Sequence, residues 1–206
     1  EVALGYAITL KSVEDNQYTK DFNLMNIKLV DSFAQFKEIQ AANVFNSGTT
    51  YDPSIGGDGQ ALFSTAHPYD MGTWANTFST QLDLNESSLL QACININSTF
   101  VDEAGLRINA TAKKLVIPPA LEPVAARLLK SELRPGTANN DINAIRQMSS
   151  GIADYMVWHY LTSNYSWYIP TSVEGLLYFD RIAYDSDMWV DNVTDNNGFL
   201  TVLKER

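Results

Sequence analysis

A long stretch of helical periodicity constrains the fold of this chain more than any other feature. Over residues 21–46 apolar side chains recur at steps of three and four residues, which places them on one face of a helix. Asp21 is suited to cap the start of this helix, and Gly48 lies just past its end. We predict an amphipathic helix whose apolar face is buried, with Phe33 and Phe36 as its central side chains. The face comprises Phe22, Met25, Leu29, Phe33 and Phe36.

Short strands and loops are predicted on both sides of this helix. Residues 1–19 alternate loosely between apolar and other side chains, which indicates a strand followed by a turn at residues 14–16. Residues 49–59 contain Asp-Pro and a glycine cluster, so they predict a loop. Residues 61–64 predict a short strand, and irregular structure is expected from there to about Thr80.

Two further helices and a buried strand are predicted in the middle of the chain. Residues 86–102 form the first helix, with Asn85 as N-cap and Gly105 as the stop signal. Residues 114–117 read as a buried strand ended by two prolines, and a helix over residues 120–133 follows. The apolar faces comprise Leu89, Cys93, Ile96 and Phe100 in the first helix, and Leu121, Val124, Leu128 and Leu129 in the second.

The C-terminal third is predicted to consist mainly of strands. Residues 137–146 are polar and rich in Asn, so an exposed loop is expected there. Residues 152–161 and 166–171 predict two aromatic-rich strands joined by a turn. Residues 176–184 and 198–203 predict two more strands with an acidic loop between them. The mixture of helices and strands predicts an α+β fold.

Composition excludes several classes of function. The 206 residues are enough for one domain or two small lobes, and no apolar run approaches the roughly 20 residues of a membrane helix. The formal net charge is −10, and the Lys and Arg residues form no basic run. Tight phosphate binding needs clustered cations, so a dedicated nucleic-acid binder is not expected. Cys93 is the single cysteine, so it cannot form an intramolecular disulfide.

Few residues are candidates for chemistry, and the sequence predicts no catalytic, cofactor-binding or metal-binding residue. His67 and His159 are the only histidines, and we expect both to serve packing. The glycines of residues 56–59 lack the lysine of a phosphate-binding loop, so we interpret them as a tight turn. Cys93 lies on an apolar helix face, where a buried thiol acts as a small hydrophobic side chain.

Two sets of side chains suggest binding hypotheses that remain weaker than a structural interpretation. A set of aspartates near the C-terminal end suggests a calcium site, but the spacing of these residues does not match an EF-hand loop. We therefore expect a solvated acidic loop there. An aromatic set invites a sugar-binding platform, but aromatic residues are favoured in strands in any case. The acidic set is Asp185, Asp187, Asp191 and Asp195, and the aromatic set is Tyr155, Trp158, Tyr160, Tyr165, Trp167 and Tyr168.

The order of these segments resembles the major capsid proteins of tailed phages, especially the Mu-like head-subunit branch. The similarity extends over nearly the whole chain, and residues 58–68, Asp-Gly-Gln-Ala-Leu-Phe-Ser-Thr-Ala-His-Pro, are its most recognisable stretch. The other similar stretches are residues 4–9, 14–18, 37–46, 114–122 with Ala125 and Ala126, and 166–169.

The resemblance implies a fold with a long spine helix, a peripheral lobe and an axial lobe. It assigns residues 1–20 to an extended loop and strand region, 21–112 to the peripheral lobe, 113–172 to the axial lobe and 173–206 to a return into the peripheral lobe. Family members usually have an arm before the Glu1 region and a further strand past the Arg206 region. Both ends are therefore expected to be cut, and these 206 residues alone are expected to assemble poorly.

The function implied is structural rather than enzymatic, and it requires no cofactor. The protein would assemble in the host cytoplasm into pentamers and hexamers of an icosahedral head shell, and it would reside in the virion around packaged double-stranded DNA. Its partners would be copies of itself, a scaffold and a portal, with no membrane. Two alternatives stay open: the shell of a bacterial nanocompartment with the same fold and a protein cargo, and an acidic carbohydrate-binding module.

Overall fold

Contacts within the chain divide it into two compact units. The computed structural model describes residues 2–9, 11, 14–15, 18–53, 57–134, 141–149, 151–173, 175–179, 185–191 and 198–205. Unit 1 combines Glu1–Gln40 with Leu176–Arg206, and unit 2 is Ala41–Gly175. In the described part of the chain, no helix is both long enough and apolar enough to cross a membrane.

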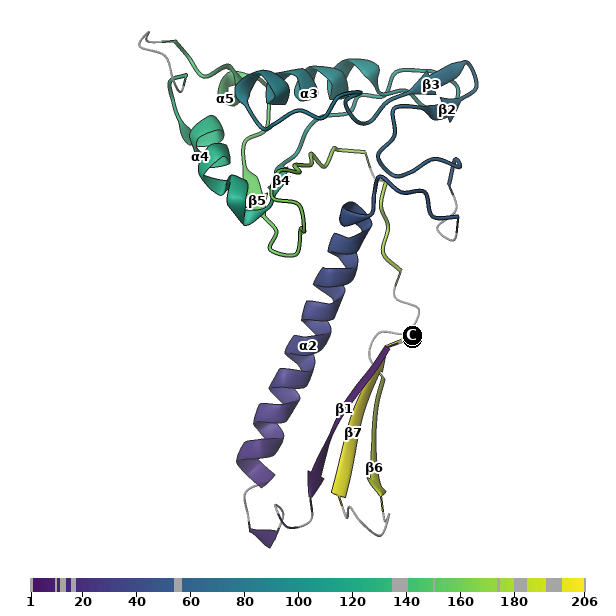
Figure 1. Ribbon diagram of the computed structural model, residues 1–206, viewed down its shortest axis with the longest axis vertical. Coiled ribbons are helices and arrows are strands. Elements are labelled where there is room, and N and C mark those ends of the chain that lie inside the picture. Colours follow the sequence, from purple (N-terminus) through teal and green to yellow (C-terminus); the bar gives the residue numbers. More distant parts are fainter. Residues whose placement is uncertain are drawn as a thin grey trace. The chain divides into compact units, whose positions relative to one another are not determined.

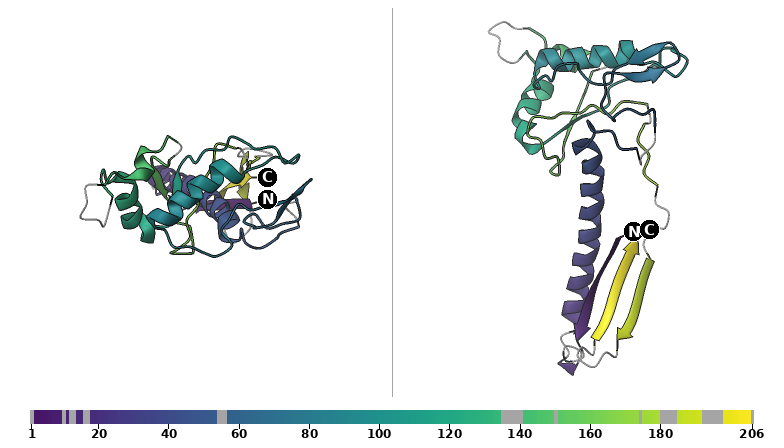
Figure 2. Two further views of the ribbon diagram at one scale, coloured as in Figure 1. Left: turned by 90° about the horizontal axis from the view of Figure 1, so that it is seen from above. Right: turned by 45° about the vertical axis from the view of Figure 1, so that its right-hand side comes forward.

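Unit 1 consists of most of a long helix and an antiparallel sheet. Helix α2 (Tyr18–Asn46) contributes its residues up to Gln40. The sheet has the order β1-β7-β6, formed by β1 (Val2–Thr9), β7 (Gly198–Glu205) and β6 (Asp185–Asp191). The pairing of β1 with β7 joins the two ends of the described chain, and the strands run side by side along α2 (Figure 1; Figure 2, right).

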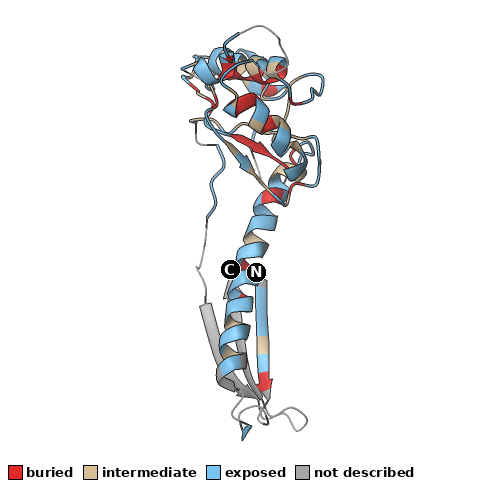
Figure 3. Ribbon diagram, turned by 90° about the vertical axis from the view of Figure 1, so that its left-hand side faces the viewer, coloured by how far each residue is buried: buried red, intermediate tan, exposed pale blue. Residues whose placement is uncertain are grey.

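Helix α2 confirms the long helix predicted from periodicity, with two corrections. It begins three residues earlier than predicted, at Tyr18, so Asp21 lies inside the helix and does not cap it. The predicted apolar face is only partly buried: Leu29 and Phe33 are buried, but Met25 is exposed. Phe36, which was predicted to be buried, is half-buried, as is Phe22. Figure 3 shows that most of the helix surface is exposed.

The sheet of unit 1 contains the largest error of the sequence interpretation. The acidic segment at residues 185–191 was predicted to be a loop, but it is strand β6. Residues 176–179, which were predicted to start a strand, have no regular structure, and residues 180–184 lie outside the described part. Three consecutive residues with high strand propensity, Met188 to Val190, lie between the aspartates. Pairing of this segment with β7 outweighs the loop preference of the aspartates.

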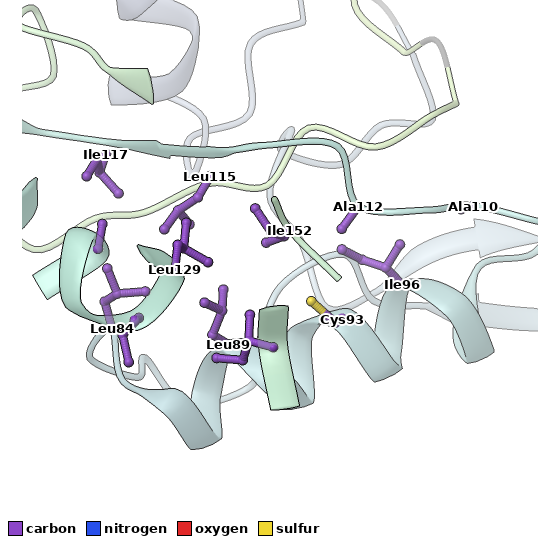
Figure 4. Close-up of a cluster of buried hydrophobic side chains, with 13 residues drawn as sticks. Leu84, Leu89, Cys93, Ile96, Ala110, Ala112, Leu115, Ile117, Leu129 and Ile152 are labelled. Carbon is purple, nitrogen blue, oxygen red and sulfur yellow. The ribbon is translucent and has the colours of Figure 1, made fainter. Parts of the chain in front are cut away.

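Unit 2 is built around one apolar core (Figure 4). Its elements are α3 (Glu86–Thr99), β4 (Leu115–Ile117), the 3-10 turn η1 (Pro119–Leu121), α4 (Glu122–Lys130), α5 (Ala144–Gln147) and β5 (Tyr155–Val157), together with the hairpin of β2 (His67–Tyr69) and β3 (Gly72–Trp74). The core comprises Leu84, Leu89, Cys93, Ile96, Ala110, Ala112, Leu115, Ile117, Ala125, Leu128, Leu129, Ile145 and Ile152.

Helix α3 confirms its predicted start but ends earlier than predicted. Asn85 Oδ1 accepts the backbone N–H of Ser88, while Ser88 Oγ accepts the backbone N–H of Asn85, which is a reciprocal capping box. The helix ends at Thr99, because the following segment turns back and pairs Val101 with Arg107. Gly105, predicted to stop the helix, instead forms this separate turn with a φ of +81°.

Strand β4 lies at the centre of the small sheet in unit 2. All three of its residues are buried, as the sequence predicted. On one side it pairs in parallel with β5, and on the other Val116 forms an antiparallel bridge with Tyr168. The two predicted aromatic strands therefore flank β4 instead of forming long strands of their own. The first is three residues long, and the second is reduced to bridges at Tyr168 and Thr171.

Three other local predictions in unit 2 need correction. The predicted strand at residues 61–64 is an irregular loop, and the true strands are β2 and β3 in the stretch predicted as irregular. Helix α4 is shorter than predicted and follows η1. The predicted exposed loop at residues 137–146 contains α5 and the buried side chains Asn143 and Ile145, while residues 137–140 lie outside the described part.

Candidate functional site

The most organised polar arrangement outside regular structure is the loop at residues 58–68. Its first residue, Asp58, reaches across to His67 at the start of β2, with 2.6 Å between Asp58 Oδ2 and His67 Nδ1. Asp58 Oδ1 also accepts the backbone N–H of Gln60 at 3.0 Å. The hydrogen bond from His67 lowers the pKa of the Asp58 carboxyl, and the Gln60 amide lowers it further, although partial burial opposes them.

The imidazole of His67 is buried and contacts this carboxylate and the ring of Trp74. An ionised carboxylate can only accept, so His67 Nδ1 carries the proton and donates it to Asp58. The ring lies 5.1 Å from that of Trp74, whose other contact is an edge-to-face pair with Phe100 at 5.0 Å. His67 Nε2 is buried and has no hydrogen-bond partner among the described residues. His67 was predicted to lie in a loop, but it is a buried strand residue.

Asn76 holds the middle of the same loop. Its Nδ2 donates to the carbonyl of Leu62 at 2.6 Å, and its Oδ1 accepts the backbone N–H of Ser64 at 2.9 Å. The backbone N–H of Asn76 donates to the carbonyl of Ser64 at 3.1 Å. A single side chain therefore supplies hydrogen bonds that a neighbouring strand would otherwise provide. The stretch that carries the strongest sequence resemblance is thus a fixed loop rather than a strand.

The last turn of α2 is held in unit 2 by an aromatic cluster. Phe45 contacts Trp158, Tyr168 and Phe63 at ring-centroid distances of 5.4, 5.2 and 6.1 Å. Phe63 in turn stacks on Tyr168 at 5.1 Å. A Cβ atom at Gly48 would lie 2.5 Å from the Phe63 ring, so only glycine fits there.

The side chain of Asn46 adds hydrogen bonds to the aromatic contacts that hold the last turn of α2. Its Nδ2 donates to the carbonyl of Tyr160 at 3.1 Å, and its Oδ1 accepts the backbone N–H of Thr162 at 3.1 Å. Both partners lie more than a hundred residues further along the chain. The end of α2 is therefore fixed to the segment that follows β5.

The aromatic residues of the sugar-platform hypothesis do not form one exposed surface. Trp158 and Tyr168 belong to the cluster around Phe45, and Trp167 donates its Nε1–H to the carbonyl of Leu82 at 3.0 Å. Tyr155 is half-buried, with Lys130 Nζ 5.0 Å above its ring. Of the six aromatic residues, only Tyr165 is exposed.

The residues of the calcium hypothesis lie along a strand instead of in a loop. Asp185 and Asp191 are the two ends of β6, so their backbones are about 20 Å apart. These two aspartates cannot converge on one ion, and Asp195 lies outside the described part. No group of three or more His, Cys, Asp or Glu side chains suited to a metal ion occurs among the residues searched, which are the described ones.

The remaining residues that the sequence analysis considered for chemistry do not form a common site. Cys93 is buried on α3, where desolvation raises the pKa of its thiol, which confirms its predicted role as a small buried hydrophobic residue. His159, predicted to lie inside a strand, is exposed in the turn after β5. Gly57 and Gly59 both have positive φ, which confirms the predicted tight turn, while Gly56 lies outside the described part.

A shallow cleft of about 300 Å³ lies between the β2–β3 hairpin and α3. Its lining includes Tyr69, Trp74, Asn95 and three threonines, but no carboxylate, imidazole or basic side chain. Acid–base catalysis needs a titratable group near neutral pH, and the cleft offers none. The sequence interpretation missed the cleft because its walls come from two segments that are about twenty residues apart and carry no motif.

Comparison with known proteins gives one match. A family model described as phage capsid protein matches residues 2–200, which is nearly the entire chain. No curated protein and no solved structure matches the chain.

Proposed function

Because the chain belongs to the phage capsid protein family, we propose that it is the head-shell subunit of a tailed bacteriophage. In this role it self-assembles into an icosahedral shell that encloses packaged double-stranded DNA. The observation that carries the proposal is the extent of the family match, which includes residues of both units. The contacts agree with a structural role, because the described residues form an apolar core, an aromatic cluster around Phe45 and a loop at residues 58–68 that is fixed by hydrogen bonds.

Within this family we propose the Mu-like branch of head subunits. The support is the stretch at residues 58–68, whose aspartate and histidine form the hydrogen bond that closes the loop. A particle structure that instead grouped this chain with another branch would count against the proposal.

We also propose that the two units correspond to the two lobes of the shell subunit. Unit 1, with the long α2 and the three-stranded sheet, would be the peripheral lobe, and unit 2 would be the axial lobe. The axial lobe expected at residues 113–172 lies within this unit, because Ala41–Gly175 is one compact unit around one core. Electron microscopy of the shell would test the assignment by placing unit 2 nearest the capsomer axis.

The proposed partners are further copies of the chain, together with a scaffold and a portal. Because the net charge is −10 and an acidic protein repels a polyanion, we do not expect the subunit to bind the packaged DNA tightly. Association with the packaged DNA would therefore be non-specific. A nanocompartment would differ in its contents, since it would hold a protein cargo in place of DNA.

The test is to express the full-length protein with its neighbouring head genes and image the product by electron microscopy. We expect closed shells, and we expect nuclease-resistant double-stranded DNA inside particles made in infected cells. A protein that remains monomeric when scaffold is supplied would contradict the shell proposal. Shells that contain an enzyme and no DNA would instead support the nanocompartment alternative.

A further inference from the structure

The segment at residues 176–179 of unit 1 is unusually apolar for a protein surface. Its four residues are Leu, Leu, Tyr and Phe, and their exposed fractions are 56%, 69%, 70% and 83%. Single exposed apolar residues are common on soluble proteins, but consecutive runs are not, and they mark contact surfaces. The free subunit therefore presents an apolar segment that water solvates poorly.

Three of the four residues of this segment have no hydrogen-bond partner among the residues that the structure describes. Leu176, Leu177 and Phe179 make no hydrogen bond with any residue that the structure describes. Tyr178 has a partner within unit 1, because Lys37 Nζ of α2 lies 5.6 Å from the centroid of its ring. Unpaired main-chain groups beside exposed apolar side chains are what a segment needs to pack against a strand or loop of another chain.

The segment remains largely exposed within the unit. Burial in this unit is described for residues 3–8, 11, 14–15, 20, 22–40 and 176–179, and the buried apolar side chains among these are Ile8, Leu29 and Phe33. Helix α2 exposes further apolar side chains at Leu24, Ile27 and Val30, each more than half exposed. Among these residues of unit 1, more large apolar side chains are exposed than buried.

Charge indicates the nature of the partner. The segment itself carries no charged side chain, so it offers nothing to a polyanion such as DNA. Copies of a chain with net charge −10 repel one another, so contacts between them are most favourable where the surface is uncharged. A second copy of the chain is the partner that fits an uncharged apolar segment on an acidic shell protein.

We propose that residues 176–179 form an apolar contact with a second copy of this chain, and that assembly buries them. The inference rests on the proposed shell function and names one of its contacts. Two aromatic side chains each bury about 150–250 Å² when fully covered. With the two leucines, the segment supplies roughly half of the ~800 Å² that each partner buries in a standard interface.

The experiment compares Leu177→Asp with Leu106→Asp in the full-length protein. Leu106 is a matched control, because it is a leucine of unit 2 with 67% exposure against 69% for Leu177. We expect both variants to melt at the wild-type temperature as unassembled subunits. We expect only Leu177→Asp to raise the subunit concentration needed for assembly, on the order of tenfold or more, because it places a charge in a buried apolar contact.

Hydrogen exchange provides a readout that does not depend on a substitution. The amides of residues 176–179 should exchange rapidly in the wild-type subunit and slowly in the assembled shell. Normal assembly of Leu177→Asp, equal loss of assembly in Leu106→Asp, or unchanged exchange in the shell would each overturn the inference. If the wild-type protein forms no shell at all, the proposed function fails first, and that outcome is distinct from these three.

Discussion

The two units of this chain differ in how they use apolar residues. Unit 2 gathers thirteen side chains from helices, strands and connecting segments into one buried cluster. In unit 1, α2 buries Leu29 and Phe33 but exposes several other apolar side chains, and residues 176–179 are exposed as well. Burial of apolar area is the main driving force of folding, so unit 2 has the means to be stable by itself. Unit 1 exposes apolar side chains on α2 and at residues 176–179, and we infer that contacts with other copies cover them.

The largest expected effect comes from a fully buried side chain of α2. Phe33 is fully buried, so Phe33→Ala should destabilise the subunit by about 3–5 kcal/mol. The half-buried Phe36 provides the control on the same helix, and Phe36→Ala should cost clearly less. Urea unfolding followed by circular dichroism would measure both. Equal costs for the two variants would contradict this account of the helix face.

A core truncation in unit 2 should have a similar but somewhat smaller effect. Leu89 is fully buried on α3, and Leu89→Ala should cost about 2–5 kcal/mol. Ile94 on the same helix is half exposed, so Ile94→Ala should change the free energy of unfolding by no more than about 0.5 kcal/mol. If the two substitutions were equivalent in chemical denaturation, α3 would not pack as described.

A buried amide offers an intermediate effect that is confined to unit 2. Asn143 Nδ2 donates to the carbonyls of Leu128 and Ser131 at 2.7 and 3.0 Å, where α4 ends. Asn143→Ala leaves both carbonyls unpaired and should cost about 1–3 kcal/mol. The exposed Asn109 serves as control, and Asn109→Ala should leave the melting temperature unchanged. An unaltered melting temperature for Asn143→Ala would show that these hydrogen bonds add no net stability.

The smallest effect is the pH dependence of the Asp58–His67 pair. Because His67 lowers the pKa of Asp58 in the folded state, this carboxyl adds stability at pH values above its unfolded pKa of about 3.9. The contribution is lost as the pH falls from there through the lowered folded pKa. We therefore expect Asp58→Asn to melt below wild type near pH 6 and to approach it below pH 4.

Melting curves between pH 7 and pH 3 would check this behaviour. A difference between wild type and Asp58→Asn that stays constant across the whole range would mean that the charge of Asp58 does not contribute. The exposed Asp70 of the same unit is a suitable control, and Asp70→Asn should follow the wild-type curve throughout.

Local sequence signals were sufficient where an element carries its own pattern. The spacing of apolar residues predicted α2, and Asn85 with the following apolar face predicted the start of α3. The buried run before Pro118 predicted β4, and β1 and β7 were also predicted close to their observed positions. In each of these elements, the signal lies within the segment that adopts the structure.

Predictions failed where a distant partner decides the local conformation. Strand β6 forms because β7 pairs with it, although its aspartates favour a loop. The segment around Tyr168 was predicted to be a strand, but it pairs with β4 only through the bridge between Tyr168 and Val116. Asn143 is buried because its side chain donates to a backbone carbonyl near the end of α4. A polar, Asn-rich stretch does not show in advance which of its residues will do this. The Asp58–His67 pair was missed for the same reason, since spacing alone does not show which loop residues meet.

The sequence by itself determined the helices α2, α3 and α4, the α+β class, the acidic net charge and the resemblance to capsid proteins that the family match supports. Only the tertiary structure decided the strand order β1-β7-β6, the division into two units and the exposure of residues 176–179. The physical reason is that periodicity and capping act over a few residues, and the sequence shows them directly. Strand pairing and burial depend on which distant segments meet, and a chain of residues acquires those neighbours only when it folds.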